Sequence, residues 1–274
     1  MTLPYIAASS YLNTAPLCYS FLRGRQKDFC HFLSDRAPAR CAEMLVELRV
    51  DAALIPVIEY PRIPGLKVIP GPCVASRGKV QSVVLASKVP IRQVTRVALD
   101  VSSRTSAALI KIILERFYRL TPQYQESVPD INEMLRSNDA ALIIGDPAIL
   151  IDRSALNVYD MAEEWRSHTG LPFVFAFWVV RQDSPHWGEG RSQNLVDFVD
   201  ARREGLAHLD EIASDYSASL GLPREDLINY LTKNISFDLD AEGMKALQLF
   251  FQLAHNQGLI DRVVEPVFQL SVQS

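Results

Sequence analysis

The chain has 274 residues, of which 48% are hydrophobic and 22% are charged, and its formal net charge is −4. This composition is typical of a globular protein of one or two domains, and the absence of a long Lys/Arg cluster argues against a nucleic-acid partner. The four cysteines show neither a CxxC motif nor the spacing of a zinc site, and no apolar run approaches the ~20 residues that span a bilayer.

The amino terminus, MTLPYIAAS, leads directly into a predicted strand. It holds no basic segment followed by a long apolar run, so no export signal is indicated. Because the cysteines also lack the pattern of a disulfide framework, we expect a cytoplasmic protein without a membrane partner.

A strand, a hydroxyl-rich turn and an apolar helix follow one another twice along the chain. The first copy contains SSYLNTAPL at residues 9–17, and the second contains VSSRTSAALI at residues 101–110, after a buried strand at 96–101. Each copy is followed by the same five residues, Asp-Ala-Ala-Leu-Ile, at 51–55 and 139–143. The repeat suggests two similar α/β lobes that offer helix starts to a shared cleft.

The remaining elements also alternate between strands and helices. In the first part of the chain we expect strands at 28–34, 52–57, 67–69 and 81–87, and a helix that begins at Pro38. Further on we expect strands at 123–128 and 140–144, a helix at 130–136, a helix that carries Trp165 and ends at Gly170, and a long strand at 171–181. The C-terminal part is predicted to be helical at 192–209, 211–220, 224–233 and 241–257.

This order predicts a discontinuous first lobe, residues 1–90 and 178–274, with a helical C-terminal part. Residues 91–177 form the inserted second lobe. Two crossings between the lobes make a hinge, and a hinge over a cleft can close on a small molecule. The alternative is a single compact α/β domain without moving parts.

The hydroxyl turn at Ser102, Ser103 and Thr105 is the first candidate site. The first N–H groups of a helix have no partner within the helix, and the positive end of the helix dipole lies at the same place. Hydroxyls beside these groups can complete a site for an anion. The alternative is that one serine caps the helix and the others face water.

Other polar residues were weighed for chemistry. Asn13 follows the first strand, where open α/β folds bind ligands, although it could equally cap the helix. Ser82 starts a strand and either binds a ligand or ends a turn, whereas the short DxP motif at Asp146 indicates by itself only a cap or turn residue. The five histidines lie in no recognised catalytic motif, neither a P-loop nor a GxGxxG motif is present, and no metal site is indicated.

Seven segments, taken in order, resemble one enzyme family closely. They are SSYLNTAPL (9–17), DAALIPVIEY (51–60), IPGLKVIPG (63–71), VQSVVLASKVPI (80–91), ALDVSSRTSAALIKIIL (98–114), ALIIGDPA (141–148) and EEWRSHTGLPFVFAFW (163–178). They resemble the chorismate dehydratases of the futalosine route to menaquinone, and the helical C-terminal part fits this family more loosely. The resemblance implies a cytosolic protein with the two-lobed periplasmic-binding-protein type II fold, with a ligand cleft and two crossover segments.

The resemblance also implies a reaction, in which chorismate loses water to give 3-[(1-carboxyvinyl)oxy]benzoate. The proton on C3 is γ to the ring carboxylate, so its removal gives a conjugated dienolate, and loss of the C4 hydroxyl makes the ring aromatic. The protein should hold the ring carboxylate as charge moves onto it, fix the geometry and exclude water. The step is redox-neutral, so no cofactor is implied, and chorismate is the expected partner.

By similarity, Asn13 and Ser82 are the expected catalytic residues, because they would lie at the reacting ring. The expected substrate-binding residues are Ser102, Ser103, Thr105, Gly145 and Asp146. Asp146 and Glu59 are candidate bases, but the favoured hypothesis is that the enolpyruvyl carboxylate of the substrate itself takes the C3 proton.

Three other functions compete with this interpretation. A 1,4-dihydroxy-6-naphthoate synthase shares the fold and pathway, although the SSRTS turn and the IPGLKVIPG stretch favour the dehydratase. A solute-binding protein for a small anion would need export. The ligand-sensing domain of a regulator would normally carry a DNA-binding helix-turn-helix, which the sequence lacks.

Overall fold

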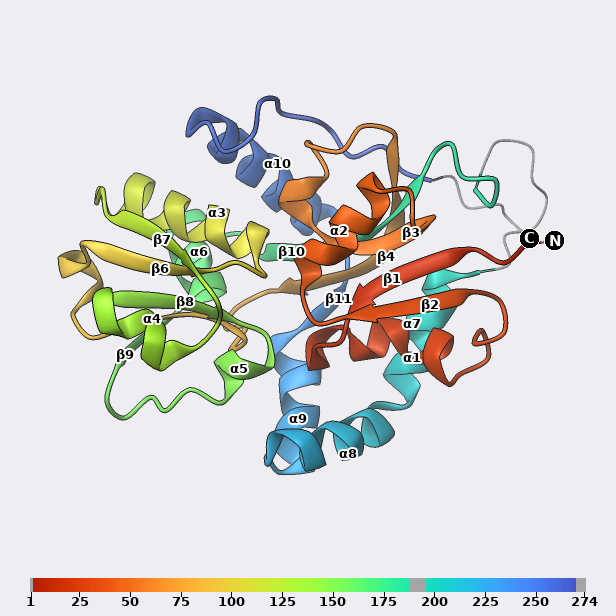
Figure 1. Cartoon of the computed structure of the whole chain (residues 1–274), viewed down its shortest axis with the longest axis horizontal. Helices are drawn as coiled ribbons and strands as arrows, with labels where there is room; N and C mark the ends of the chain where they lie inside the picture. Colours follow the sequence, from red (N-terminus) through yellow and green to blue (C-terminus); the bar gives the residue numbers. More distant parts are fainter. Residues whose placement is uncertain (1, 188–195, 270–274) are drawn as a thin grey trace.

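A computed structural model describes residues 2–187 and 196–269, which form two lobes, each built on its own sheet (Figure 1). In the first lobe the strand order is β11-β4-β10-β3-β1-β2, and in the second it is β7-β6-β8-β5-β9. The two-lobed α/β architecture predicted from the sequence is therefore confirmed.

The first sheet combines parallel and antiparallel pairs. Strand β1 is parallel to β2 and β3, whereas β10 is antiparallel to β3 and β4. Its strands are β1 (Tyr5–Ser9), β2 (His31–Asp35), β3 (Ala52–Pro56), β4 (Leu66–Ser76), β10 (Phe173–Arg181) and β11 (Ser236–Asp238). Strand β4 is much longer than the strand expected at 67–69, and it pairs with β10 on one side and β11 on the other. The helices before the first crossing are η1 (Leu12–Thr14), α1 (Ala15–Leu22), α2 (Pro38–Val46) and η2 (Val57–Glu59).

The second sheet lies on the left in Figure 1. Strand β6 is parallel to β7 and β8, and β5 is antiparallel to β8 and β9. Its strands are β5 (Val83–Ser87), β6 (Arg96–Asp100), β7 (Gln123–Ser127), β8 (Ala140–Ile144) and β9 (Asn157–Asp160). The helices are η3 (Ile91–Gln93), α3 (Arg104–Ile112), η4 (Ile113–Phe117), α4 (Ile131–Ser137), α5 (Asp146–Ile149) and α6 (Met161–Thr169).

The repeated Asp-Ala-Ala-Leu-Ile segments occupy equivalent central positions in the two sheets. All five residues of β3 and all five of β8 are buried, as expected for strands covered by helices on both faces. Strands β1 and β3 end at the cleft in the first lobe, and β6 and β8 end at the cleft in the second. The helices that follow β1 and β6 therefore begin at the same cleft.

The crossings between the lobes lie elsewhere than the sequence indicated. Strand β5 pairs with β8 and β9, so residues 83–87 belong to the second sheet and not to a first lobe that runs to residue 90. The chain crosses at residues 77–82 and returns at 170–172, because β10 pairs with β3 and β4 from Phe173 onward. An apolar strand such as VVLAS suits either sheet by pattern, and only its pairing decides between them.

The C-terminal helices pack on the first lobe. They are α7 (Phe198–Ala207), α8 (Leu209–Leu220), α9 (Arg224–Asn229), the π-helical turn η5 (Tyr230–Asn234) and α10 (Ala241–Asn256). The start of the helix predicted at 192–209 lies partly outside the described residues, and α7 begins after Asp197, whose carboxylate accepts hydrogen bonds from Val199 N and Asp200 N. At Gly205 a Cβ would lie 1.8 Å from the Pro16 carbonyl oxygen, so glycine lets α7 pack closely on α1.

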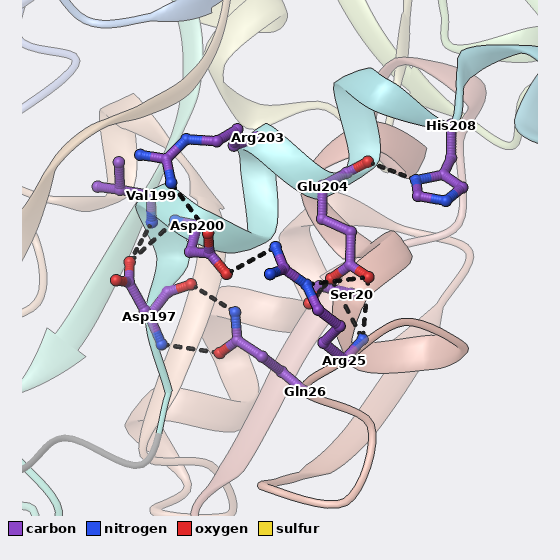
Figure 2. A network of polar contacts seen from close by, with 9 residues as sticks. All are labelled: Ser20, Arg25, Gln26, Asp197, Val199, Asp200, Arg203, Glu204 and His208. Atoms are coloured by element: carbon purple, nitrogen blue, oxygen red, sulfur yellow. Dashed lines mark hydrogen bonds and ion pairs between the residues drawn. The ribbon is translucent and has the colours of Figure 1, made fainter.

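A network of polar contacts joins α1 to α7 (Figure 2). The buried carboxylate of Glu204 accepts hydrogen bonds from Ser20 Oγ at 2.6 Å and from Arg25 N at 3.0 Å. Gln26 and the Asp197 backbone exchange two hydrogen bonds, both of 2.8 Å. These contacts make α7 part of the first lobe. None of the helices in the part of the chain that the structure describes combines the length and the apolar character needed to cross a bilayer.

Candidate functional site

A cavity lies between the two lobes and is lined by residues of both. Residues at the carboxyl ends of strands from both sheets line it, which is the usual location of a ligand site in such folds. From the first lobe the lining residues are Ser9, Tyr11, Asn13, Thr14, Pro38, Leu54, Pro56, Val74, Phe175 and Ala176. From the second lobe they are Val83, Ser103, Thr105, Ser106, Ile144 and Gly145.

The start of α3 forms one wall of this cavity. Ser103 occupies the N-cap position, but its side chain accepts no hydrogen bond from the first N–H groups of the helix. Thr105 Oγ1 accepts a hydrogen bond from Ile58 N of the first lobe at 3.3 Å. The helix start therefore lies at the cavity without a capping side chain, and its N–H donors are available to an anion.

Ser102 is oriented differently from Ser103. Its backbone N and its hydroxyl donate to Asp100 Oδ1 at 2.8 and 2.6 Å, and it does not line the cavity. Asp100 is 2% exposed and its second oxygen has no hydrogen-bond partner, so burial raises the pKa of this carboxyl group. Asp100 was not singled out from the sequence, although a carboxylate at the end of a buried strand was a usable signal.

The turn after β1 brings Asn13 into the cavity. The Thr14 hydroxyl donates to Ser9 O at 2.6 Å and to Tyr11 O at 2.8 Å, so Thr14 closes this turn. Asn13 caps neither η1 nor α1, since their N-cap residues are Tyr11 and Thr14. Its half-buried side chain is left to line the cavity.

Ser82 lies behind the cavity wall. It is fully buried and is not among the lining residues. Its hydroxyl donates to Val80 O over a long 3.4 Å and accepts a 2.7 Å hydrogen bond from the hydroxyl of Tyr230 in η5. The sequence did not predict this contact of Tyr230, because a tyrosine in an apolar helical pattern is typical of an ordinary core residue.

Gly145 and Asp146 bring the second lobe against the turn that carries Asn13. Gly145 has φ of +66°, and a Cβ there would lie 2.7 Å from the ring of Tyr11. Asp146 Oδ1 accepts a hydrogen bond from Leu12 N at 2.9 Å. Burial raises the pKa of Asp146 to about 6, although this hydrogen bond lowers it. Asp146 does not itself line the cavity.

Glu59 is engaged in ion pairs outside the cavity. Its two oxygens accept hydrogen bonds from Arg62 at 2.6 Å and from Arg104 at 3.0 Å, and Arg104 also donates to Glu43 at 2.7 Å. Because Arg104 is the first residue of α3, these pairs tie the second lobe to the first. Within residues 2–187 and 196–269, no three His, Cys, Asp or Glu side chains are grouped as a metal site.

Known proteins resemble the chain in sequence and in fold. The model of a family described as menaquinone biosynthesis matches residues 4–256. A chorismate dehydratase from Thermus thermophilus is 31% identical over 267 residues, which cover 90% of this chain and 94% of that protein.

Two solved structures show the shared fold. The first is protein AF1704 from Archaeoglobus fulgidus, with a TM-score of 0.74 and 17% identity over 94% of this chain and 98% of that one. The second is the periplasmic aliphatic sulphonate-binding protein SsuA from Escherichia coli, with a TM-score of 0.66 and 15% identity over 99% and 94% of the two chains. The chain therefore has the two-lobed fold of periplasmic binding proteins.

Proposed function

The chain belongs to the menaquinone-biosynthesis family, and from this premise we propose that it dehydrates chorismate to 3-[(1-carboxyvinyl)oxy]benzoate. Its chorismate dehydratase relative supports this reaction. The geometry adds a cavity that is lined by an uncapped helix start from the second lobe and by Asn13 from the first. These are the groups that a dianionic ring substrate requires.

The observation that carries the proposal is the composition of the cavity wall. Among the described residues, no Asp, Glu, His, Lys, Arg or Cys side chain lines the cavity. Tyr11 is its titratable lining residue, and burial raises the pKa of that phenol, which keeps it protonated. Asp146 and Glu59 lie outside the wall and are held by other partners. This arrangement supports the hypothesis that the enolpyruvyl carboxylate of the substrate takes the C3 proton.

The start of α3 is suited to hold the ring carboxylate. As the C3 proton leaves, negative charge moves toward this carboxylate, and fixed N–H donors beside the Ser103 and Thr105 hydroxyls stabilise it. Donors that are already oriented need not reorganise during the reaction. Apolar residues such as Val74, Val83 and Phe175 can hold the ring and exclude water from the intermediate.

Asn13 lines the same cavity from the first lobe and can act on another part of the substrate. Its amide can donate a hydrogen bond to the departing C4 hydroxyl or orient the enolpyruvyl group. Elimination then requires no protein base, since the substrate holds a carboxylate close to C3. Aromatisation supplies a large thermodynamic driving force, so orientation and charge stabilisation are sufficient catalytic tasks.

We place this reaction on the futalosine route and in the cytosol. The four cysteines are buried free thiols, which suits a reducing compartment.

The proposal is tested by incubating the purified protein with chorismate and following the absorbance of the aromatic product, with its identity established by mass spectrometry. Single replacement of Asn13, Ser82, Asp146 and Glu59 then assigns roles. If loss of one carboxylate side chain abolished turnover while chorismate still bound, the substrate-assisted mechanism would be wrong. Binding of chorismate without any turnover by the wild-type protein would indicate a binding protein. Turnover of a futalosine-derived substrate alone would indicate the naphthoate synthase.

A further inference from the structure

Arg104 joins the start of α3 to two carboxylates of the first lobe. Its guanidinium donates to Glu59 Oε2 at 3.0 Å and to Glu43 Oε1 at 2.7 Å. The Glu59 side chain is buried and that of Arg104 is 36% exposed, so the contact with Glu59 is partly shielded from water. Hydrogen bonds between two charged groups are stronger than neutral ones. The second lobe is therefore attached to the first at the beginning of α3.

Two backbone N–H groups of the first lobe make contacts beside these ion pairs. Ala39 N of α2 donates to Ser102 O, and Ile58 N of η2 donates to Thr105 Oγ1, each over 3.3 Å. Both distances lie beyond the usual range of about 2.7–3.2 Å for such hydrogen bonds. The contacts of Arg104 are shorter and carry charge. We therefore assign the attachment of α3 to the first lobe mainly to Arg104.

The place of Arg104 in its helix does not favour the helix itself. Arg104 is the first residue of α3, where the positive end of the helix dipole lies, and a cation at this end is unfavourable. Its neighbours Ser103 and Thr105 line the cavity, whereas Arg104 does not. The guanidinium thus neither stabilises the helix start nor lies in the cavity, and its contacts are with the first lobe.

The proposed reaction needs groups from both lobes around one substrate. The start of α3 lines the cavity from the second lobe, and Asn13 lines it from the first. The ring of the substrate holds its carboxylate and its C4 hydroxyl at a fixed distance from each other. The two protein groups must therefore stand at one separation if both are to contact the substrate correctly. Contacts between the lobes at the start of α3 set this separation.

We propose that Arg104 is a positioning residue for the dehydration, which holds the anion-binding start of α3 at the separation from Asn13 that the substrate requires. This inference rests on the proposed function. Because Arg104 does not line the cavity, it acts through its contacts with Glu59 and Glu43 and not through the substrate. The inference also gives Glu59 a task other than that of a base.

The test compares Arg104→Gln with the wild-type enzyme in the full chain. The variant keeps a long polar side chain and loses the cation, so the substrate itself must bring α3 into place. Apparent affinity falls with the fraction of molecules in the competent arrangement, and we expect KM for chorismate to rise at least about tenfold. The value of kcat should stay within about threefold, because bound substrate restores the arrangement. A KM within about twofold of the wild-type value would overturn the inference.

Arg62→Gln is the matched control. Arg62 donates to the other oxygen of Glu59 at 2.6 Å, and both residues belong to the first lobe. The exposed fraction of its side chain is 41%, close to the 36% of Arg104. This variant removes the same charge from the same carboxylate and leaves the contacts between the lobes in place, so KM should stay within about twofold. An equal rise of KM in both variants would mean that the unpaired charge of Glu59 repels the substrate, and Arg104 would have no positioning role.

Hydrogen exchange of two backbone amides gives a readout that is independent of turnover. Ala39 N and Ile58 N donate across the interface between the lobes, so their exchange reports whether α3 stays in place. In Arg104→Gln both amides should exchange at least about tenfold faster than in the wild-type protein, and in Arg62→Gln they should keep their rates. Unchanged exchange in Arg104→Gln would refute the positioning role, whatever the substrate. A wild-type protein that does not dehydrate chorismate would instead refute the proposed function.

Discussion

Asp146 of the second lobe accepts a hydrogen bond from the backbone N–H of Leu12 in the first lobe, over 2.9 Å. Leu12 immediately precedes Asn13, so this bond ties the turn that carries Asn13 in one lobe to the start of α5 in the other. The ring of Tyr11 lies against Gly145 beside it. The two lobes therefore complete the site together, and we expect residues outside the cavity wall to influence activity through this contact.

Loss of the Asp146 carboxylate should weaken the closed state. In Asp146→Ala the Leu12 N–H loses its partner, which costs about 1–3 kcal/mol for a buried group. We expect KM for chorismate to rise at least about fivefold, and the radius of gyration by small-angle scattering to increase in the free protein. Asp146→Asn keeps an acceptor oxygen and should stay close to wild type at neutral pH. Equal losses in both variants would argue for a role of the charge itself.

The ionisation of Asp146 should make stability depend on pH. Its pKa is raised to about 6 in the folded protein, mainly by burial, against roughly 3.9 in an unfolded chain. At pH values between these two pKa values, the folded state binds more protons than the unfolded state. The contribution of Asp146 to stability is therefore greatest below pH 4 and declines as the pH rises to about 6. Asn at this position has no such dependence.

The measurement is the difference in melting temperature between Asp146→Asn and wild type, which cancels the other titrating groups. The melting temperature of the variant minus that of the wild-type protein should rise from pH 4 to about 6 and then level off. A difference that is flat, or that falls over this range, would contradict the raised pKa.

Gly145→Ala should hinder closure. The new Cβ would lie 2.7 Å from the Tyr11 ring, in a backbone conformation with φ of +66° that side chains rarely adopt. We expect kcat/KM to fall more than about tenfold, since either the cleft opens or Tyr11 leaves its place. Gly170→Ala is the control, because Gly170 also has a positive φ, of +73°, but a Cβ there would meet no neighbouring side chain or backbone within 4 Å. It should lose stability and keep its activity.

Ser103→Asp should separate stability from binding. The wild-type serine makes no capping hydrogen bond, whereas aspartate is a good cap and interacts favourably with the helix dipole. We expect unfolding to become harder by about 0.5–1 kcal/mol, and chorismate to bind at least about tenfold more weakly, because the new carboxylate occupies the anion site. Ser103→Asn caps without a charge and should weaken binding less. Unchanged affinity in the Asp variant would remove α3 from the proposed mechanism.

Glu59→Gln tests whether a protein carboxylate acts as the base. Glu59 is 4% exposed, and Arg62 and Arg104 contact it with exposed fractions of 41% and 36%. Both arginine side chains can become solvated by water when the Glu59 charge is removed. We therefore expect the unfolding free energy to fall by about 2 kcal/mol, which is less than the ~3–5 kcal/mol lost when one partner of a fully buried ion pair is removed. The value of kcat should stay within about threefold. Binding without turnover would instead identify Glu59 as the base.

Much of the site could be predicted from local pattern. Four of the expected site residues line the cavity: Asn13, Ser103, Thr105 and Gly145. Asn13, Ser103 and Thr105 could be predicted because they follow buried strands, and the carboxyl ends of parallel strands meet at one edge of a sheet. Gly145 was implied by the family resemblance alone. Their roles toward the substrate stay a prediction.

Other parts of the site depend on contacts that no local pattern reports. Ser102, which is turned toward Asp100, and Ser82 and Asp146 lie outside the cavity wall. Tyr230 reaches Ser82 across 148 positions in the chain, and its helical spacing is that of an ordinary core residue. The assignment of β5 to the second sheet depends on its pairing with β8 and β9.

By itself, then, the amino-acid order determined the two lobes, the alternation of strand and helix, and the hydroxyl-rich helix starts, because these follow from side-chain periodicity and backbone preferences over a few residues. Only the tertiary structure decided which polar groups face the cavity and which hold one another behind it. The reason is that a buried hydroxyl or carboxylate must find a partner wherever the fold brings one, irrespective of distance along the chain.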